Sequence, residues 1–162
     1  MTGGPRIVQS YFHTPTEAAR RVFTVVLRAG HLQASPDYRV ERRICAGSDL
    51  LLCLRGRGYV QVAGRAFPVG PGQMAWLNGR HPHAHWAEET EPWELLWLRI
   101  DGARLDEIIK ELRVEEWPVF DLPRPRKAAR LLRRVLGLLS SRPAAMEALA
   151  HAEVTCLIAL LF

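Results

Sequence analysis

The sequence predicts a mainly β domain followed by α-helices. Residues 22–100 contain short apolar runs separated by turn sequences, which is the pattern of an antiparallel sandwich or barrel. Beyond Gly102 the apolar residues recur at helical spacing instead. The length of 162 residues fits one domain that can bury its own core.

The apolar runs define the expected strands. We expect strands at 22–27, 38–40, 50–54, 59–62, 74–77 and 93–100. The sequences S-P-D, R-G-R-G, V-G-P-G and N-G-R lie between them. Glycine, proline, asparagine and aspartate favour the backbone conformations of tight turns, so these sequences indicate where the chain reverses.

Three helices are expected after the strands, at 105–112, 127–141 and 144–162. Prolines at positions 118, 123 and 125 exclude a continuous helix between the first two, because proline lacks an N–H donor and clashes with the preceding turn. The second helix carries its apolar side chains on one side, at Leu131, Leu132, Val135, Leu138 and Leu139. The chain ends on the apolar run I-A-L-L-F, which predicts that the natural protein continues beyond Phe162.

Composition and charge narrow the class of protein. The chain has 22 Lys and Arg against 17 Asp and Glu, a net charge of +5 that fits several kinds of partner. The basic residues at 124–134 are interpreted as the solvated face of a helix. Three cysteines are too few for a secreted disulfide scaffold. No apolar run has the length of a membrane-spanning helix, and the N-terminus lacks a signal-peptide core, so we expect a soluble cytoplasmic protein.

Five motifs occur in order between residues 28 and 102. They are S-P-D-Y-R-V-E-R, L-R-G-R-G-Y-V, G-R-A-F-P-V-G-P-G-Q, the N-G-x-x-P-H group ending at His83, and P-W-E-L-L-W-L-R-I-D-G. The succession of short strands, turns and a Pro-His pair is typical of a double-stranded β-helix, the cupin jelly-roll barrel. In order and spacing the five motifs resemble the N-terminal effector-binding and dimerisation domain of AraC-family transcriptional regulators.

The resemblance implies a cupin-like barrel sensor over residues 1–102 and a helical dimerisation segment of the same unit over 103–162. It implies a protein that is not an enzyme, requires no cofactor, binds a small-molecule effector inside the barrel and forms a homodimer. Promoter DNA would be bound only through a C-terminal helix-turn-helix domain, and nothing in residues 1–162 resembles one. We expect dimerisation through the stripe at Leu131, Leu132, Val135, Leu138 and Leu139.

Aromatic residues indicate the expected ligand pocket. Trp93, Trp97 and Arg99 are spaced by even numbers along one strand and therefore share a face, and Trp76 lies on another strand. Indoles with an arginine or a histidine such as His83 would form a small-molecule pocket inside the barrel. The resemblance adds that Trp97 stands where a sugar-binding member stacks its ligand. It also places Arg42 or Arg43 near a ligand-contacting arginine. The expected ligand-binding residues are Trp97, Trp93, Arg43, Arg42, His83, Trp76 and Arg99.

His81, His83 and His85 support an alternative function. Imidazole is the commonest metal ligand, so the cluster could belong to a small metal-dependent cupin enzyme of the isomerase or dioxygenase type. Same-face neighbours in one strand lie about 6.6–6.8 Å apart, which is too far for all three to share one ion, and Pro82 disturbs the strand. A third reading is a cupin that acts as a scaffold without binding a ligand. We therefore expect no metal site, with the effector-binding regulator as the main hypothesis.

Overall fold

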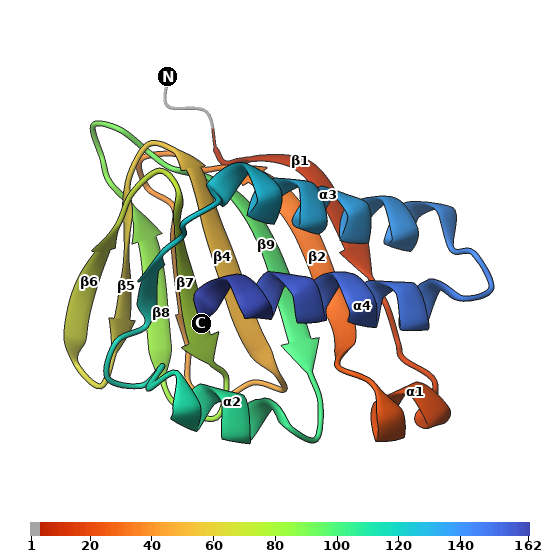
Figure 1. Ribbon diagram of the computed structural model, residues 1–162. Helices are drawn as coiled ribbons and strands as arrows, with labels where there is room; N and C mark the ends of the chain where they lie inside the picture. The colour runs from red at the N-terminus through yellow and green to blue at the C-terminus, as the bar shows by residue number, and fades with distance from the viewer. Residues whose placement is uncertain (1–3) are drawn as a thin grey trace.

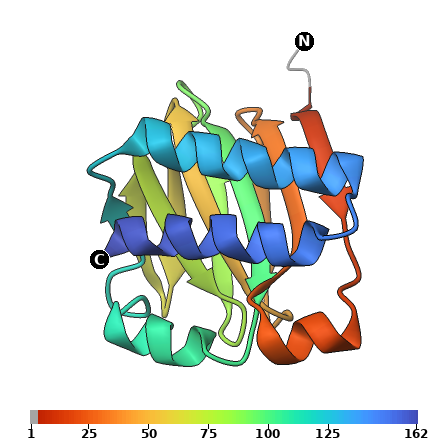
Figure 2. The same ribbon diagram turned by 45° about the vertical axis from the view of Figure 1, so that its right-hand side comes forward.

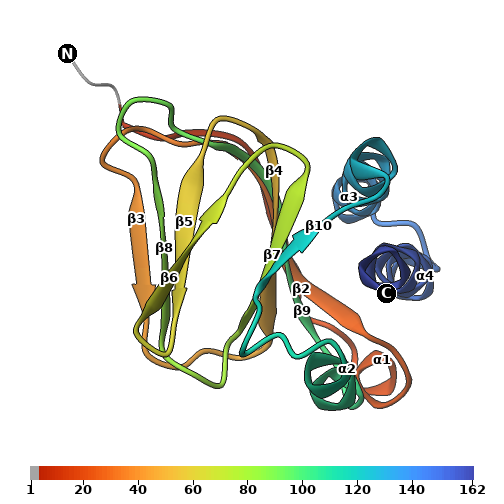
Figure 3. The ribbon, with the colours of Figure 1, turned by 60° about the vertical axis from the view of Figure 1, so that its left-hand side comes forward.

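The protein consists of two antiparallel β-sheets packed face to face, with helices on the outer side of the larger sheet. The computed structural model describes residues 4–162, and within that range the larger sheet has six strands and the smaller has four. Figure 3 shows the smaller sheet on one side, the larger sheet in the middle and the helices α3 and α4 beyond it. The arrangement confirms the predicted mainly β, cupin-like fold with C-terminal helices.

Every neighbouring pair of strands in both sheets is antiparallel. The larger sheet contains, in spatial order, β1 (Arg6–Phe12), β2 (Val25–Gln33), β9 (Glu94–Asp101), β4 (Ser48–Arg55), β7 (Gln73–Asn78) and β10 (Val119–Asp121). The smaller sheet contains β3 (Arg39–Arg42), β8 (His83–Ala87), β5 (Gly58–Val62) and β6 (Arg65–Val69).

The central strands β4 and β9 are covered on both faces. Leu51 of β4 and Leu95 of β9 belong to the core between the two sheets. Leu50 of β4 and Leu96 of β9, one position away in each strand, belong to the core between the larger sheet and the helices. Strands buried on both faces have nearly continuous apolar sequences, which explains the runs that predicted them.

The helices pack mainly against the larger sheet. They are α1 (Glu17–Val22), α2 (Leu105–Glu111), α3 (Pro125–Ser141) and α4 (Met146–Ile158), followed by the short 3-10 helix η1 (Ala159–Leu161). In Figures 1 and 2, α3 and α4 run side by side across that sheet. Pro125 occupies the first turn of α3, where its missing N–H costs nothing. No helix between residues 4 and 162 combines the length and the apolar character needed to cross a lipid bilayer.

The apolar stripe of α3 serves the core of its own chain. Leu131, Leu132, Val135 and Leu139 are buried against the larger sheet and α4, and Leu138 packs on the same core. The prediction that this stripe forms a dimer interface does not fit the structure, because these side chains are already covered within one protomer. The amphipathic pattern identified a buried face but not the surface that covers it.

The elements differ from the expected ones mainly at the N-terminus. The strand expected at 22–27 begins only at Val25, because α1 extends to Val22. The side-chain oxygen of Thr16 accepts a hydrogen bond from the Ala19 N–H at 3.2 Å and caps this helix. Strands β1, β6 and β10 were also missed, since β1 and β6 are largely exposed and β10 has only three residues.

The burial of the α3 stripe leads to a stability prediction. We expect Leu132→Ala to lower the free energy of unfolding by about 2–5 kcal/mol, because it removes a fully buried side chain and leaves a cavity. Leu149→Ala, on an exposed position of α4, should change it by less than about 0.5 kcal/mol. Urea denaturation measures both. Equal effects of the two substitutions would contradict the placement of the stripe in the core.

Candidate ligand-binding site

A cavity of about 120 Å³ lies between the two sheets. From the larger sheet it is lined by Arg28, Asp49, Leu51, Leu95, Trp97 and Arg99. From β3, β8 and the segment before β3 it is lined by Tyr38, Val40, Arg42 and His85. The cavity thus combines an apolar wall with several polar and charged side chains, as small-molecule sites do.

Strand register places four of the side chains around the cavity in one row. Phe12 of β1 pairs with Arg28 of β2, Arg28 pairs with Arg99 of β9, and Arg99 pairs with Asp49 of β4. Residues directly opposite each other in neighbouring strands bring their side chains together. The row therefore runs from the edge strand β1 to the centre of the larger sheet.

Asp49 and Arg99 form a bidentate ion pair. Arg99 Nε donates to Asp49 Oδ1 at 2.8 Å, and Arg99 Nη2 donates to Asp49 Oδ2 at 2.9 Å. Burial raises the pKa of the Asp49 carboxyl, but His83 and Arg99 outweigh that effect and hold the pKa at about 2. Asp49 is therefore a carboxylate at neutral pH, and its charge is already matched by Arg99.

His83 and His85 point into the barrel from β8, and both are buried. His83 Nδ1 lies 2.9 Å from the carbonyl oxygen of His81, and His83 Nε2 lies 3.9 Å from Asp49 Oδ2. The His85 ring lies 5.7 Å from the Tyr38 ring and 6.1 Å from the Trp93 ring, and its buried Nδ1 has no hydrogen-bond partner in the part of the chain that the structure describes. Burial lowers the pKa of His85 to about 4, and Asp49 only partly offsets this, so the imidazole is neutral at pH 7.

Trp97 lines the cavity and lies close against the opposite strand because the residue opposite it is glycine. Gly30 of β2 pairs directly with Trp97 of β9. A β-carbon at position 30 would come within 2.6 Å of the indole ring. A glycine inside a strand is a sequence signal for such a close approach. The guanidinium of Arg28 lies near two aromatic rings, with Cζ 5.8 Å from the Trp97 ring and 4.5 Å from the Phe12 ring.

The structure brings together some of the predicted ligand-binding residues. Trp97, Arg42 and Arg99 line the cavity, and His83 reaches toward Asp49 at its wall. Trp93 is fully buried in the core between the sheets, behind His85, with its ring over Gly58.

Two predicted residues lie elsewhere. Arg43 is exposed and borders a separate, open depression that also includes Pro82. Trp76 lies in the core between the larger sheet and the helices, because the alternation along β7 turns Ala75 and Leu77 toward the barrel. The expectation that Trp76 lines the barrel interior is therefore wrong.

Three polar residues of the cavity were missed by the sequence analysis. Arg28 lies within β2 and Asp49 near the start of β4, and a charged residue beside apolar ones in a strand is the available signal for a polar group that faces an interior. Tyr38 precedes β3, and burial raises the pKa of its hydroxyl to about 12. The phenol is therefore a neutral hydrogen-bonding group.

The histidines do not converge on one point. His81 Nε2 lies 2.9 Å from Glu115 Oε1 on the surface, whereas His83 and His85 face the interior. Among residues 4–162 no three His, Cys, Asp or Glu side chains are grouped so that they could hold a metal ion. The alternative of a metal-dependent enzyme that uses all three histidines has no support in this geometry.

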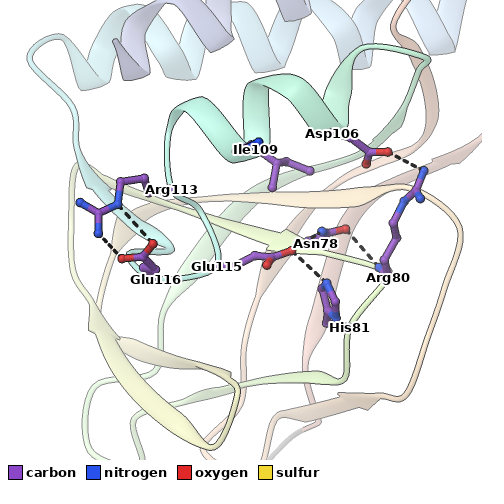
Figure 4. A pocket seen from close by; sticks show the side chains of 9 residues that line it. Asn78, Arg80, His81, Asp106, Ile109, Arg113, Glu115 and Glu116 are labelled. Carbon is purple, nitrogen blue, oxygen red and sulfur yellow. Dashed lines mark hydrogen bonds and ion pairs between the residues drawn. The ribbon is translucent and has the colours of Figure 1, made fainter.

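A larger hollow of about 380 Å³ lies beside α2 (Figure 4). Its charged side chains pair with one another: Arg80 with Asp106 at 2.8 Å, His81 with Glu115, and Arg113 with Glu116. All of these groups lie at the surface. Because its ion pairs are largely self-contained, we place the candidate site in the barrel and not here.

An antiparallel double-sheet jelly roll that encloses a small polar cavity is the architecture of cupin-type binding domains. The family described as "AraC-like ligand binding domain" matches residues 26–153. The chain therefore belongs to the AraC-like ligand-binding domain family, which confirms the resemblance found in the sequence.

One curated relative and several solved structures are similar to parts of this chain. The MmsAB operon regulatory protein of Pseudomonas aeruginosa is 30% identical in an alignment of 77 residues, and the match covers 45% of this chain and 25% of that protein. The chain thus spans a minor part of the relative's length. The AraC-like transcriptional activator CuxR has the same fold, with a TM-score of 0.54 at 12% identity over 82% of this chain and 51% of its own. A cupin superfamily protein from Desulfitobacterium hafniense covers 62% of this chain and 83% of its own, at 14% identity and a TM-score of 0.45.

The low pKa of His85 predicts a pH dependence of stability. The folded pKa is about 4 and the unfolded one about 6.5, so the unfolded chain binds more protons between these values. Stability contributed by the neutral ring is therefore lost as the pH falls through this window, by about 2 kcal/mol between pH 7 and pH 5. His85→Phe keeps an aromatic ring between Tyr38 and Trp93 and removes the titration.

Denaturant melts at pH 7 and pH 5 test this directly. We expect His85→Phe to lose about 2 kcal/mol less than the unmodified protein on acidification. His81→Gln, on the surface, should follow the unmodified protein. Parallel losses in His85→Phe and the unmodified protein would show that His85 does not titrate as the structure requires.

Proposed function

We propose that this chain is the effector-sensing and dimerisation part of an AraC-type transcription regulator, with a small molecule bound in the barrel cavity. The observation that carries the proposal is that two residues lining the cavity, Arg28 and His85, each have a buried polar atom, Nε and Nδ1 respectively, with no hydrogen-bond partner among residues 4–162. Buried polar groups are nearly always paired in folded proteins, so a bound ligand is the natural partner. Family membership supports a binding role and not a catalytic one.

The N-terminal strand supplies a route from the cavity to the rest of the molecule. Phe12 of β1 packs on the Arg28 guanidinium, which lines the cavity. Strand β1 is otherwise largely exposed at the edge of the larger sheet (Figure 1). A ligand that contacts Arg28 therefore alters the surface on which β1 rests. If β1 has two arrangements, the ligand shifts the equilibrium between them only by the difference in its affinity for the two.

Dimerisation is proposed to use α4 in place of the α3 stripe. The outward side of α4 is exposed yet uncharged, with Ala148, Leu149, Ala152, Thr155 and Cys156. The acidic residues of α4, Glu147 and Glu153, pair with other parts of the chain, so this outward side is left without charge. The outward side of α3 instead carries Arg126, Arg130 and Arg133, which would repel a second copy. Small side chains on α4 would let two such helices approach closely.

The partner of the whole regulator is proposed to be promoter DNA, bound through a C-terminal helix-turn-helix domain outside this chain. The name of the Pseudomonas relative, a regulatory protein of an operon, supports this role. The cytoplasm is the proposed location, since the three cysteines are free thiols and would stay reduced there.

Native mass spectrometry of the purified chain tests the sensor role. We expect a dimer that carries a small organic adduct, because the cavity holds unpartnered polar groups. Trp97→Ala should lose the adduct, since it removes the largest side chain that lines the cavity. Trp117→Ala on the exposed surface should keep it. One metal ion per chain that is lost on His83→Ala would contradict the proposal and favour a metallo-cupin enzyme.

Sedimentation velocity tests the dimer interface. Ala152→Glu puts a charge at the centre of the uncharged side of α4. It should shift the dimer to monomer and raise the dissociation constant of the dimer at least tenfold. Ala103→Glu makes the same chemical change at an exposed position before α2 and should leave the dimer intact. A dimer that persists in Ala152→Glu would place the interface on another surface.

A further inference from the structure

Charge is unbalanced in the barrel cavity. Among the described residues, three arginines line it, Arg28, Arg42 and Arg99, against one carboxylate, Asp49. Asp49 is engaged in both hydrogen bonds to Arg99. The other titratable side chains of the wall, Tyr38 and His85, are neutral at pH 7. Two guanidinium groups therefore face the cavity without a matching negative charge.

The surroundings of Arg28 leave it free to bind an anion. Its guanidinium lies near the Phe12 ring and the Trp97 ring. Cation–π attraction to aromatic rings does not use the N–H donors of a guanidinium, which stay available for hydrogen bonds. The buried Nε is one of these donors and has no acceptor among residues 4–162. A carboxylate accepts two parallel hydrogen bonds from a guanidinium edge of this kind.

The neighbouring positive charges of Arg28 and Arg99 also favour an anionic ligand. Arg28 is directly opposite Arg99 in the register of β2 and β9, and like charges at directly opposed positions are destabilising. Asp49 neutralises Arg99 from the β4 side only. An anion beside Arg28 would balance the remaining charge.

The rest of the wall limits the size and the polarity of the ligand. Val40, Leu51, Leu95 and the Trp97 ring are apolar. The cavity of about 120 Å³ is smaller than the roughly 300–1,000 Å³ of pockets for drug-sized ligands. A molecule that fits has a short carbon chain and one anionic head.

We infer that the barrel binds a short-chain aliphatic carboxylate, with its carboxylate on Arg28 and Arg42 and its carbon chain against Leu51, Leu95 and Trp97. This inference rests on the proposed sensor function and names the ligand class of the same cavity. Arg42 projects from the smaller sheet and Arg28 from the larger, so one anion would connect the two sheets.

Isothermal titration calorimetry at pH 7 and constant ionic strength tests the inference, with the unmodified chain as receptor. The probes are acetate, butyrate and octanoate, with butyramide as the neutral isostere of butyrate and inorganic phosphate as an anion without a carbon chain. We expect butyrate to bind at least tenfold more tightly than butyramide and phosphate. Octanoate should bind more weakly than butyrate, because its chain exceeds the cavity.

Variants of the arginines separate a charge contact from a general loss of structure. Arg28→Gln and Arg42→Gln should each weaken butyrate binding at least tenfold. Arg43→Gln, next in sequence to Arg42 but outside the cavity, should leave it unchanged. Arg42 is exposed, so its replacement leaves the fold intact, and a thermal melt of each variant checks this.

Three results would overturn the inference: equal affinity for butyrate and butyramide, unchanged butyrate binding in both Arg28→Gln and Arg42→Gln, or no binding of any carboxylate in the series. The small molecule detected by native mass spectrometry distinguishes failure of the carboxylate inference from failure of the proposed sensor role. A neutral adduct that depends on Trp97 would refute the carboxylate and retain the sensor. A metal ion lost on His83→Ala would refute both.

Discussion

The antiparallel pairing of β4 with β9 determines which side chains face the cavity and which face the helices. Both strands are buried on their two faces, so their side chains alternate between the barrel interior and the core under α3 and α4. In the barrel, this places Asp49 and Arg99 directly opposite each other. On the other face, it builds the apolar surface that anchors the C-terminal helices.

The polar groups of the barrel are expensive to bury and only partly paired. A bidentate geometry offsets much of the desolvation of Asp49 and Arg99, because both oxygens of the carboxylate receive a charge-assisted hydrogen bond. Among residues 4–162, Arg28 Nε and His85 Nδ1 have no such compensation. A domain selected only for stability would replace these groups with apolar ones, and their presence supports the proposed binding site.

Much of the fold could be predicted from the sequence, and less of the site. Apolar runs between turn sequences located β2, β4, β5, β7 and β9, and even spacing correctly placed Trp93 and Trp97 on one face. Trp76 was misplaced because M-A-W-L has no polar residue to show which face is which. Arg28 and Asp49 were missed because a single charged residue in an apolar strand does not reveal its cross-strand partners, which come from segments far apart in the sequence.

Gly30 and Trp97 constrain the order in which this barrel can change during evolution. A side chain at position 30 would overlap the indole, so the glycine cannot be replaced while the tryptophan remains in place. The reverse order is open, because a smaller residue at position 97 frees the space above Gly30. Single substitutions that preserve the packing can therefore change position 97 first and position 30 second, but not position 30 first.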